Sequence, residues 1–265
     1  MVNFISLSSG SNGNCYYIGN HEASILIDAG IGPRTIKKRL LQYGLSLDKI
    51  DFILVTHDHI DHVRALGALA DRCHIPIYTT EFLYKVMLNY RYIGDKIKGY
   101  VKYIQLDSTN TYKGISFIPF KVPHDANETL GYYIDFYGKK FTFLTDTGAI
   151  TDSVLKYSCM ADSLIIEANY DMQMLLDGPY TYELKKRISN GYGHLCNTQT
   201  ADIIRRIYSK NLEHIFLCHL SENNNTPEKA YEAISEVLNQ SGAKVGEDIT
   251  LNCLPRRDVS ELFII

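Results

Sequence analysis

The stretch from Thr56 to His62 concentrates side chains that can bind metal ions. It contains three histidines and two aspartates, at positions 57, 58, 59, 61 and 62, and follows the apolar residues 52–55, which predict a buried strand. Imidazole and carboxylate ligands together suit zinc, iron or manganese. His57 and His59 can reach one ion together, whereas the adjacent Asp61 and His62 are better explained by a second ion. The alternative is a histidine-rich surface turn, but packing alone gives no reason for such a cluster at a strand end.

Further candidate ligands follow other predicted strands. The apolar runs at residues 24–27, 115–122, 140–144 and 215–218 lead to Asp28, His124, Asp146 and His219. A single histidine or aspartate after a strand is more often a surface or turn residue. Strands that end at one edge of a scaffold can, however, gather a site from distant parts of the chain. His57, His59, Asp61 and His62 of the first cluster, with His124, Asp146 and His219, supply five histidines and two aspartates, enough for two ions that keep open positions.

Predicted strands and helices alternate on both sides of a hairpin expected at residues 132–144. Helices are expected at residues 33–43, 63–70, 81–90, 182–188, 199–208 and 226–238. Residues 8–14, which are small and include two glycines, are expected to form a loop, and residues 91–110 carry no assignable pattern. The order predicts two sheets packed face to face with helices outside, in a single domain spanning residues 1–265.

Composition limits the class of protein. The 265-residue chain is 45% hydrophobic, which excludes wholesale disorder, and its net charge of −3 gives no sign of bulk nucleic-acid binding. No apolar run approaches membrane-spanning length, and the N-terminus does not resemble a signal peptide. The six cysteines form no CxxC pair, so they are interpreted as reduced thiols of a cytoplasmic protein.

The order of the candidate ligands resembles the metallo-β-lactamase superfamily. The resemblance implies an α/β (α+β) fold, the four-layer αββα sandwich of that superfamily. Within it, the sequence is similar to the YycJ-like (WalJ-like) hydrolases, which are regarded as DNA exonucleases. The similarity lies in residues 9–14, 167–171, 193–197 and 220–224. That subfamily usually has serine at the position of Cys196, which is not a proposed ligand.

The resemblance also implies a role for each candidate ligand. One divalent ion is held by His57, His59 and His124, the other by Asp61, His62 and His219, and Asp146 bridges the two. Two ions can lower the pKa of a bridging water to give hydroxide near neutral pH and can polarise a phosphoryl oxygen. Zinc is the first expectation, with manganese or iron as alternatives. Asp28 is expected to orient a ligand or the local backbone instead of binding metal. True β-lactamases of the superfamily lack this aspartate bridge, so antibiotic hydrolysis does not fit the chain.

Other residues are assigned by weaker signals. His194 is expected to donate a proton to the leaving oxygen or to pair with a substrate phosphate, and the alternative is a loop histidine bonded to backbone. The 9–14 segment could present hydroxyl and N–H groups to a phosphate, or be only a tight turn. The basic residues 185–187 and 205–206 could line the path of a polynucleotide, or be solvated helix faces. The expected substrate-binding residues are Ser9, Ser11, Asn12, Asn14 and Asn197.

The combined expectation is a dinuclear metal-dependent phosphodiesterase, a 5′-to-3′ DNA exonuclease in which Asp61 helps to orient the hydroxide. Its expected partner is nucleic acid, with no membrane, and the oligomeric state is open. The first alternative is a thioesterase of the glyoxalase II kind, which shares the ligand set but needs a C-terminal helical region. The others are an RNA-processing nuclease of the same superfamily and a non-enzymatic nucleic-acid-binding module.

Overall fold

The computed structural model describes residues 1–265 and divides them into two compact units. The first unit comprises Met1–Lys113, Ala126–Glu128 and Pro255–Ile265. The second comprises Gly114–Asp125 and Thr129–Leu254. The expectation of one domain over the whole chain stays a prediction.

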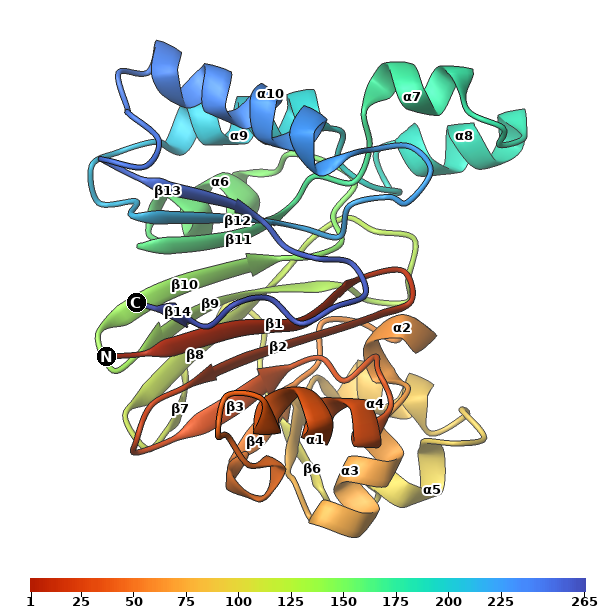
Figure 1. The fold of residues 1–265 in the computed structure, drawn as a ribbon. Coiled ribbons are helices and arrows are strands. Elements are labelled where there is room, and N and C mark those ends of the chain that lie inside the picture. The colour runs from red at the N-terminus through yellow and green to blue at the C-terminus, as the bar shows by residue number, and fades with distance from the viewer. The chain divides into compact units, whose positions relative to one another are not determined.

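The first unit contains a sheet with the strand order β14-β1-β2-β3-β4-β5-β6. The pairs from β14 to β3 are antiparallel, and those from β3 to β6 are parallel. Because β14 pairs with β1, the two ends of the chain meet in this sheet (Figure 1). The strands are β1 (Asn3–Gly10), β2 (Gly13–Gly19), β3 (Ser24–Ile27), β4 (Phe52–Leu54), β5 (Ile77–Thr79), β6 (Val101–Tyr103) and β14 (Phe263–Ile264), and the unit also holds β7 (Asn110–Tyr112).

The helices of the first unit cover one face of this sheet. Figure 1 shows α1, α3, α4 and α5 on the same side of strands β1 to β6. Helix α1 begins at Pro33, which has the backbone angle that a first helical position needs, and turns Ile36 and Leu40 inward. The helices are α1 (Pro33–Leu41), the short 3₁₀ helix η1 (Leu47–Lys49), α2 (Ile60–Val63), α3 (Leu66–Cys73), α4 (Glu81–Met87) and α5 (Gly94–Ile97).

The predicted loop at residues 8–14 is instead a β-hairpin. Strands β1 and β2 pair as far as Gly10 and Gly13, so that only Ser11 and Asn12 form the exposed turn. Small residues are typical of loops, but here they also suit a strand buried on both faces, where large side chains would not fit. Four of the six residues from Ser9 to Asn14 are therefore strand residues.

The second unit is built on parallel strands extended by a hairpin. Its strands lie in the order β13-β12-β11-β10-β9-β8, with β10 to β13 parallel and β8 to β10 antiparallel. Strand β11 is buried along its whole length, as is usual for parallel strands covered on both faces. The strands are β8 (Ile115–Lys121), β9 (Leu130–Phe136), β10 (Lys139–Leu144), β11 (Ser163–Glu167), β12 (His214–Cys218) and β13 (Thr250–Cys253).

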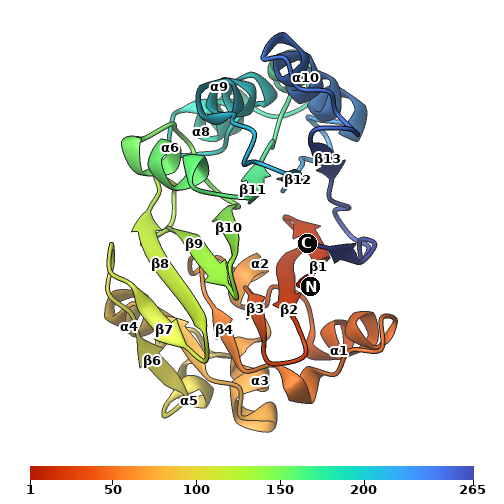
Figure 2. The ribbon, with the colours of Figure 1, turned by 90° about the vertical axis from the view of Figure 1, so that its left-hand side faces the viewer.

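Three helices of the second unit pack on this sheet and enclose its main core. Figure 2 shows α6 (Asp152–Cys159), α9 (Asn197–Ile207) and α10 (Pro227–Gln240) on the same side of β11, β12 and β13. The core between them includes Ile166, Ile204, Leu217 and Ile234, each fully buried. Two further helices, α7 (Met172–Asp177) and α8 (Tyr182–Ser189), pack on a separate small cluster formed by Tyr170, Leu175 and Cys196.

Candidate functional site

In the first unit, the histidine-rich turn is fastened by the segment that follows β3. Ala29 N–H donates to His62 O and Gly30 N–H donates to Asn14 O, each at 2.8 Å. Ala65 N–H donates back to Ala29 O, also at 2.8 Å. These backbone bonds hold α2 against the start of β2 and the segment after β3, so the turn residues are positioned by neighbouring strands.

Gly30 is the point of closest approach in this arrangement. A Cβ atom there would lie 1.6 Å from Asp61 O and 2.7 Å from Asn14 N. We expect Gly30→Ala to lower the free energy of unfolding by about 3 kcal/mol, because the backbone atoms packed against Gly30 cannot move aside without strain. At about 2–4 °C per kcal/mol, the midpoint of thermal unfolding monitored by circular dichroism should fall by roughly 6–12 °C. Gly32→Ala is the matched control, because its nearest neighbour would be Thr35 Oγ1 at 4.0 Å. Equal melting of the two variants would contradict the prediction.

Asp28 joins the end of β3 to this turn. Its fully buried carboxylate accepts hydrogen bonds from Thr56 N–H at 2.8 Å, Thr56 Oγ1 at 2.7 Å and His62 Nδ1 at 2.7 Å. Burial raises the pKa of Asp28, and the His62 charge and the three hydrogen bonds oppose that effect. The residue adopts a left-handed backbone conformation with φ 59°, which aspartate tolerates better than most residues. Asp28 thus contacts both a predicted ligand and the turn backbone, as an orienting role requires.

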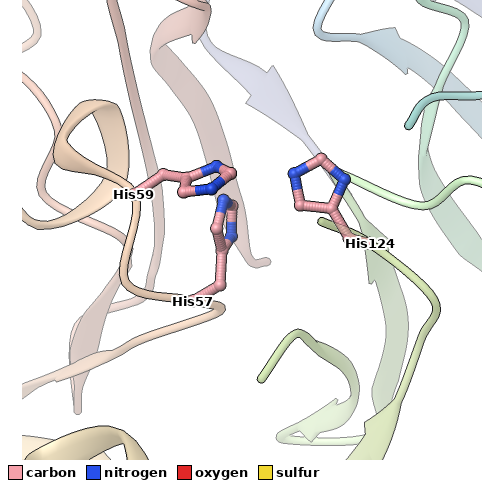
Figure 3. Close-up of side chains that lie close together, drawn as sticks. All are labelled: His57, His59 and His124. Carbon is pink, nitrogen blue, oxygen red and sulfur yellow. The ribbon is translucent and has the colours of Figure 1, made fainter. Parts of the chain in front are cut away.

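Two histidines of the turn, His57 and His62, present their Nε2 atoms as acceptors. Thr56 Oγ1 donates to Asp28, so it accepts from Nδ1 of His57, at 3.0 Å. His62 donates from Nδ1 to Asp28, which leaves the lone pair of each ring on Nε2. Figure 3 shows His57 and His59 rising from the same turn, and their ring centroids are 4.7 Å apart. The His57 and His62 rings are 4.0 Å apart, so the predicted ligands of this turn gather in one place.

The remaining carboxylate of the turn has a different environment. Asp58 is buried, and its Oδ2 accepts from Tyr90 OH and Asn127 Nδ2, both at 2.7 Å. Asn127 N–H also donates to Asp58 Oδ1 at 3.2 Å. Asp58 therefore fastens the outer side of the turn to other parts of the first unit, and it is not among the proposed ligands.

Two residues expected to bind substrate are instead buried beside the ligands. Ser9 Oγ and Tyr16 OH are 2.9 Å apart, and Tyr16 OH donates to Asn14 Oδ1 at 3.3 Å. Asn14 Nδ2 lies 2.9 Å from His62 Nε2 and 3.4 Å from Asp61 Oδ2. Ser9 and Asn14 are both fully buried, so they line the predicted ligands instead of forming an exposed phosphate loop. A metal ion on His62 Nε2 would replace the hydrogen bond from Asn14.

In the second unit, three parallel strands bring candidate residues to one edge. Strands β10, β11 and β12 are neighbours in parallel register, so their carboxyl ends lie together. Asp146 follows β10, Glu167 ends β11 and His219 follows β12. Their side chains, with that of His194, place ligand-type atoms within 4.8 Å of one another. His219 is held at φ 53°, a left-handed conformation that is uncommon for residues other than glycine.

Glu167 is a candidate site residue that the sequence analysis does not predict. Its buried Oε1 accepts from His194 Nδ1 at 2.6 Å and from His219 Nδ1 at 2.9 Å. Its Oε2 accepts from the N–H groups of Thr147 at 3.2 Å and Leu195 at 3.1 Å. Burial raises the pKa of Glu167, but the His194 charge and the two imidazole hydrogen bonds outweigh it, so the pKa is lowered. Its place at a strand end, the signal used for Asp146 and His219, could have identified it.

His124 is oriented by the loop that carries His194. Its Nδ1 donates to Gly193 O at 2.7 Å, which leaves the lone pair on Nε2. The carboxylate oxygens Asp125 Oδ1 and Asp146 Oδ1 lie 3.4 and 3.7 Å from Nε2. Burial lowers the pKa of His124, opposed by the charge of Asp146, so the ring is neutral at pH 7. Figure 3 shows the His124 ring on the loop that follows β8. Its ring centroid is 5.0 Å from that of His194.

His194 has the opposite electrostatic environment. Burial alone would lower its pKa, but the charge and hydrogen bond of Glu167, with the charge of Asp146, raise the pKa to about 9. The side chain keeps 21% of its surface exposed. With Nδ1 bonded to Glu167, the second proton of the imidazolium is on Nε2.

Asn197 is buried and makes hydrogen bonds within the second unit. It is 3% exposed, and its amide pairs with that of Asn225 through two hydrogen bonds of 3.0 and 2.8 Å. Its N–H donates to Tyr170 O at 2.9 Å. These bonds anchor the start of α9 directly after the His194 loop, so Asn197 is not carried into the site proposed below.

The comparisons with known proteins give the family. The sequence pattern of the Beta-lactamase superfamily domain matches residues 23–219, so the chain belongs to that superfamily. The predicted relationship to YycJ-like hydrolases is confirmed. The chain is 34% identical to "Exodeoxyribonuclease YycJ" of Bacillus anthracis over 247 residues, which cover 93% of this chain and 92% of that protein. It is 35% identical to "Exodeoxyribonuclease WalJ" of Streptococcus pneumoniae over 243 residues, covering 91% and 90%.

The fold class is confirmed by a solved structure. The metallo-β-lactamase fold protein YhfI from Bacillus subtilis matches with a TM-score of 0.70, covering 98% of this chain and all of that one at 19% identity. The two mixed sheets flanked by helices are therefore those of the metallo-β-lactamase fold. Family and fold together make the protein a metal-dependent hydrolase. None of its helices is both long and apolar enough to cross a membrane.

Proposed function

We propose that the protein is a dinuclear metal-dependent phosphodiesterase that degrades DNA as a 5′-to-3′ exonuclease. Relatives that match more than nine-tenths of the chain are named exodeoxyribonucleases, which supports a nucleic-acid substrate. The observation that carries the proposal is the orientation of the imidazoles. Four imidazoles have Nδ1 bonded to a hydroxyl, carboxylate or carbonyl group: those of His57, His62, His124 and His219. Each therefore carries on Nε2 the lone pair that can bind a metal ion.

The proposed ligand set divides between two divalent ions. His57, His59 and His124 would hold one ion, Asp61, His62 and His219 the other, and Asp146 would bridge them. The donors are neutral imidazoles and carboxylates, which suit zinc first and manganese or iron as alternatives. When bound, such ions lower the pKa of a coordinated water and polarise a phosphoryl oxygen.

The other groups of the site handle protons and position the attacking water. Protonated His194 would donate from Nε2 to the oxygen that leaves when the phosphodiester bond breaks. Glu167 keeps that imidazolium charged and oriented through its 2.6 Å hydrogen bond. Asp61, whose side chain is 18% exposed, would accept a hydrogen bond from the water and orient it.

The proposal is tested on end-labelled DNA after chelation and reloading with zinc or with manganese. Linear strands with a 5′-phosphate, linear strands with a 5′-hydroxyl, closed circles and RNA of equal length are compared in parallel. We expect stepwise loss from the 5′ end of DNA, intact circles and no reaction after chelation. Nicked circles would overturn the exonuclease assignment, and preferred cleavage of RNA would overturn the DNA assignment. Hydrolysis of a glutathione thioester without DNA cleavage would assign the site to the thioesterase class.

A further inference from the structure

Helix α8 exposes apolar side chains that the core does not use. None of its residues is buried, although it carries Tyr182, which is 75% exposed, and Leu184, which is 37% exposed. The neighbouring helix α7 exposes Leu176 to 57%, and Figure 1 shows the two helices side by side. Tyr192, just after α8, is 63% exposed. An exposed group of this kind is typical of a surface that contacts a partner.

The same helix is basic. It contains Lys185, Lys186 and Arg187 against the single acid Glu183. Lys185 donates to a carbonyl oxygen of α7, and Arg187 pairs with Asp125 at 2.5 Å. Lys186 makes neither kind of contact.

Helical spacing places this lysine beside the exposed aromatic ring. Lys186 stands four residues after Tyr182, which puts the two side chains on one face of the helix. A flat aromatic ring next to a cation is the combination that binds a base and its phosphate in single-stranded nucleic acids.

The C-terminal end of α8 packs directly on the loop that carries Gly193 and His194. His194 N–H donates to Ile188 O at 2.9 Å. A Cβ on Gly193 would lie 2.1 Å from the same oxygen, so the loop rests on the last turn of the helix. Gly193 O in turn accepts from His124. A single strand of DNA bound along α8 would therefore lead to His124 and His194, which this loop positions.

We propose that Tyr182, Lys186 and Tyr192 form a docking surface for the single strand of DNA that enters the site. Tyr182 and Tyr192 stack on bases, and Lys186 contacts a phosphate. The inference rests on the proposed nuclease function and names the form of substrate that the second unit recognises. Stacking and one phosphate contact carry no sequence code, so the surface binds strands of any sequence.

The test separates binding from chemistry. Binding of a fluorescent oligothymidine to the full-length protein is measured by anisotropy in the presence of chelator, over a range of salt concentrations. The double variant Tyr182→Ala/Lys186→Ala is expected to bind roughly tenfold more weakly, from the loss of one stacking contact. The slope of log K against log salt should fall by about 0.7, from the loss of one phosphate contact. Tyr231→Ala/Lys244→Ala removes the same groups from exposed positions elsewhere in the second unit and is the matched control.

Hydrolysis assays on the metal-loaded protein complete the test. KM for the oligothymidine should rise about tenfold in the double variant, while turnover of bis(p-nitrophenyl) phosphate should be unchanged. Unaltered oligothymidine binding, or an equal loss in the control variant, would overturn the docking surface. An equal loss of activity toward bis(p-nitrophenyl) phosphate would also overturn it, because α8 would then only support the loop that carries His194. A wild-type protein that binds the oligothymidine but hydrolyses neither substrate would contradict the proposed function. The docking surface would then be judged by the anisotropy measurements alone.

Discussion

An Asp146→Asn variant is expected to hydrolyse DNA about 10³-fold more slowly than the wild type. The carboxylate is 2% exposed, and its Oδ1 lies 3.4 Å from His219 Nδ1 and 3.7 Å from each of His124 Nε2 and His194 Nδ1. In the proposed bridging role, its charge offsets the repulsion between two cations, and a neutral amide would not. The loss of several kcal/mol of stabilisation, at 1.36 kcal/mol per factor of ten, gives the expected size of the effect.

The measurement joins single-turnover hydrolysis to metal content by mass spectrometry. We expect Asp146→Asn to retain its circular dichroism spectrum and to hold fewer than two metal ions per chain. Asp135→Asn is the matched control, because Asp135 belongs to the neighbouring strand β9 and accepts a hydrogen bond only from the hairpin N–H of Gly138 at 2.7 Å. Full metal content with full activity in Asp146→Asn would remove the bridge from the mechanism.

The sequence was informative where chemistry and strand ends coincide. The turn at 57–62 is rich in ligand groups directly after an apolar strand, and no packing requirement explains it, so its prediction did not depend on three-dimensional detail. Asp146 and His219 were predicted for a related reason. Parallel neighbouring strands end at the same edge, and the register of β10, β11 and β12 places these residues there.

The sequence was less informative where a role depends on contacts between distant residues. Glu167 is also a strand-end carboxylate, but only the register of β11 against β12 puts it beside His219 and within reach of the His194 loop. Asn14 was assigned to a loop because small polar residues are typical of loops. In the structure it is a buried strand residue, because Gly10 and Gly13 let the hairpin continue almost to its tip. Composition does not distinguish a small residue that turns from one that must fit a tight space.

Glu167→Gln is expected to weaken metal binding about 10- to 100-fold, the usual cost of removing a group that orients a ligand histidine. Glutamine keeps the size of the side chain but replaces one acceptor oxygen by an NH₂ donor. The four groups around Glu167, which are two imidazole Nδ1 atoms and two backbone N–H groups, are all donors in the wild type. Two of them would lose their acceptor, so stability should also fall by about 1–3 kcal/mol.

His194→Ala separates the two actions of Glu167. It removes the proposed proton donor and leaves the 2.9 Å hydrogen bond between Glu167 and His219 in place. We therefore expect it to lower turnover while zinc affinity, measured by competition with a chromogenic chelator, stays close to wild type. The loss in turnover should be larger for DNA than for bis(p-nitrophenyl) phosphate, whose leaving group needs no proton. If Glu167→Gln kept wild-type zinc affinity, the carboxylate would act on His194 alone. If His194→Ala lost zinc as strongly as Glu167→Gln, His194 would itself be a ligand, and the group of Asp146, Glu167, His194 and His219 would have to be interpreted as part of the metal site.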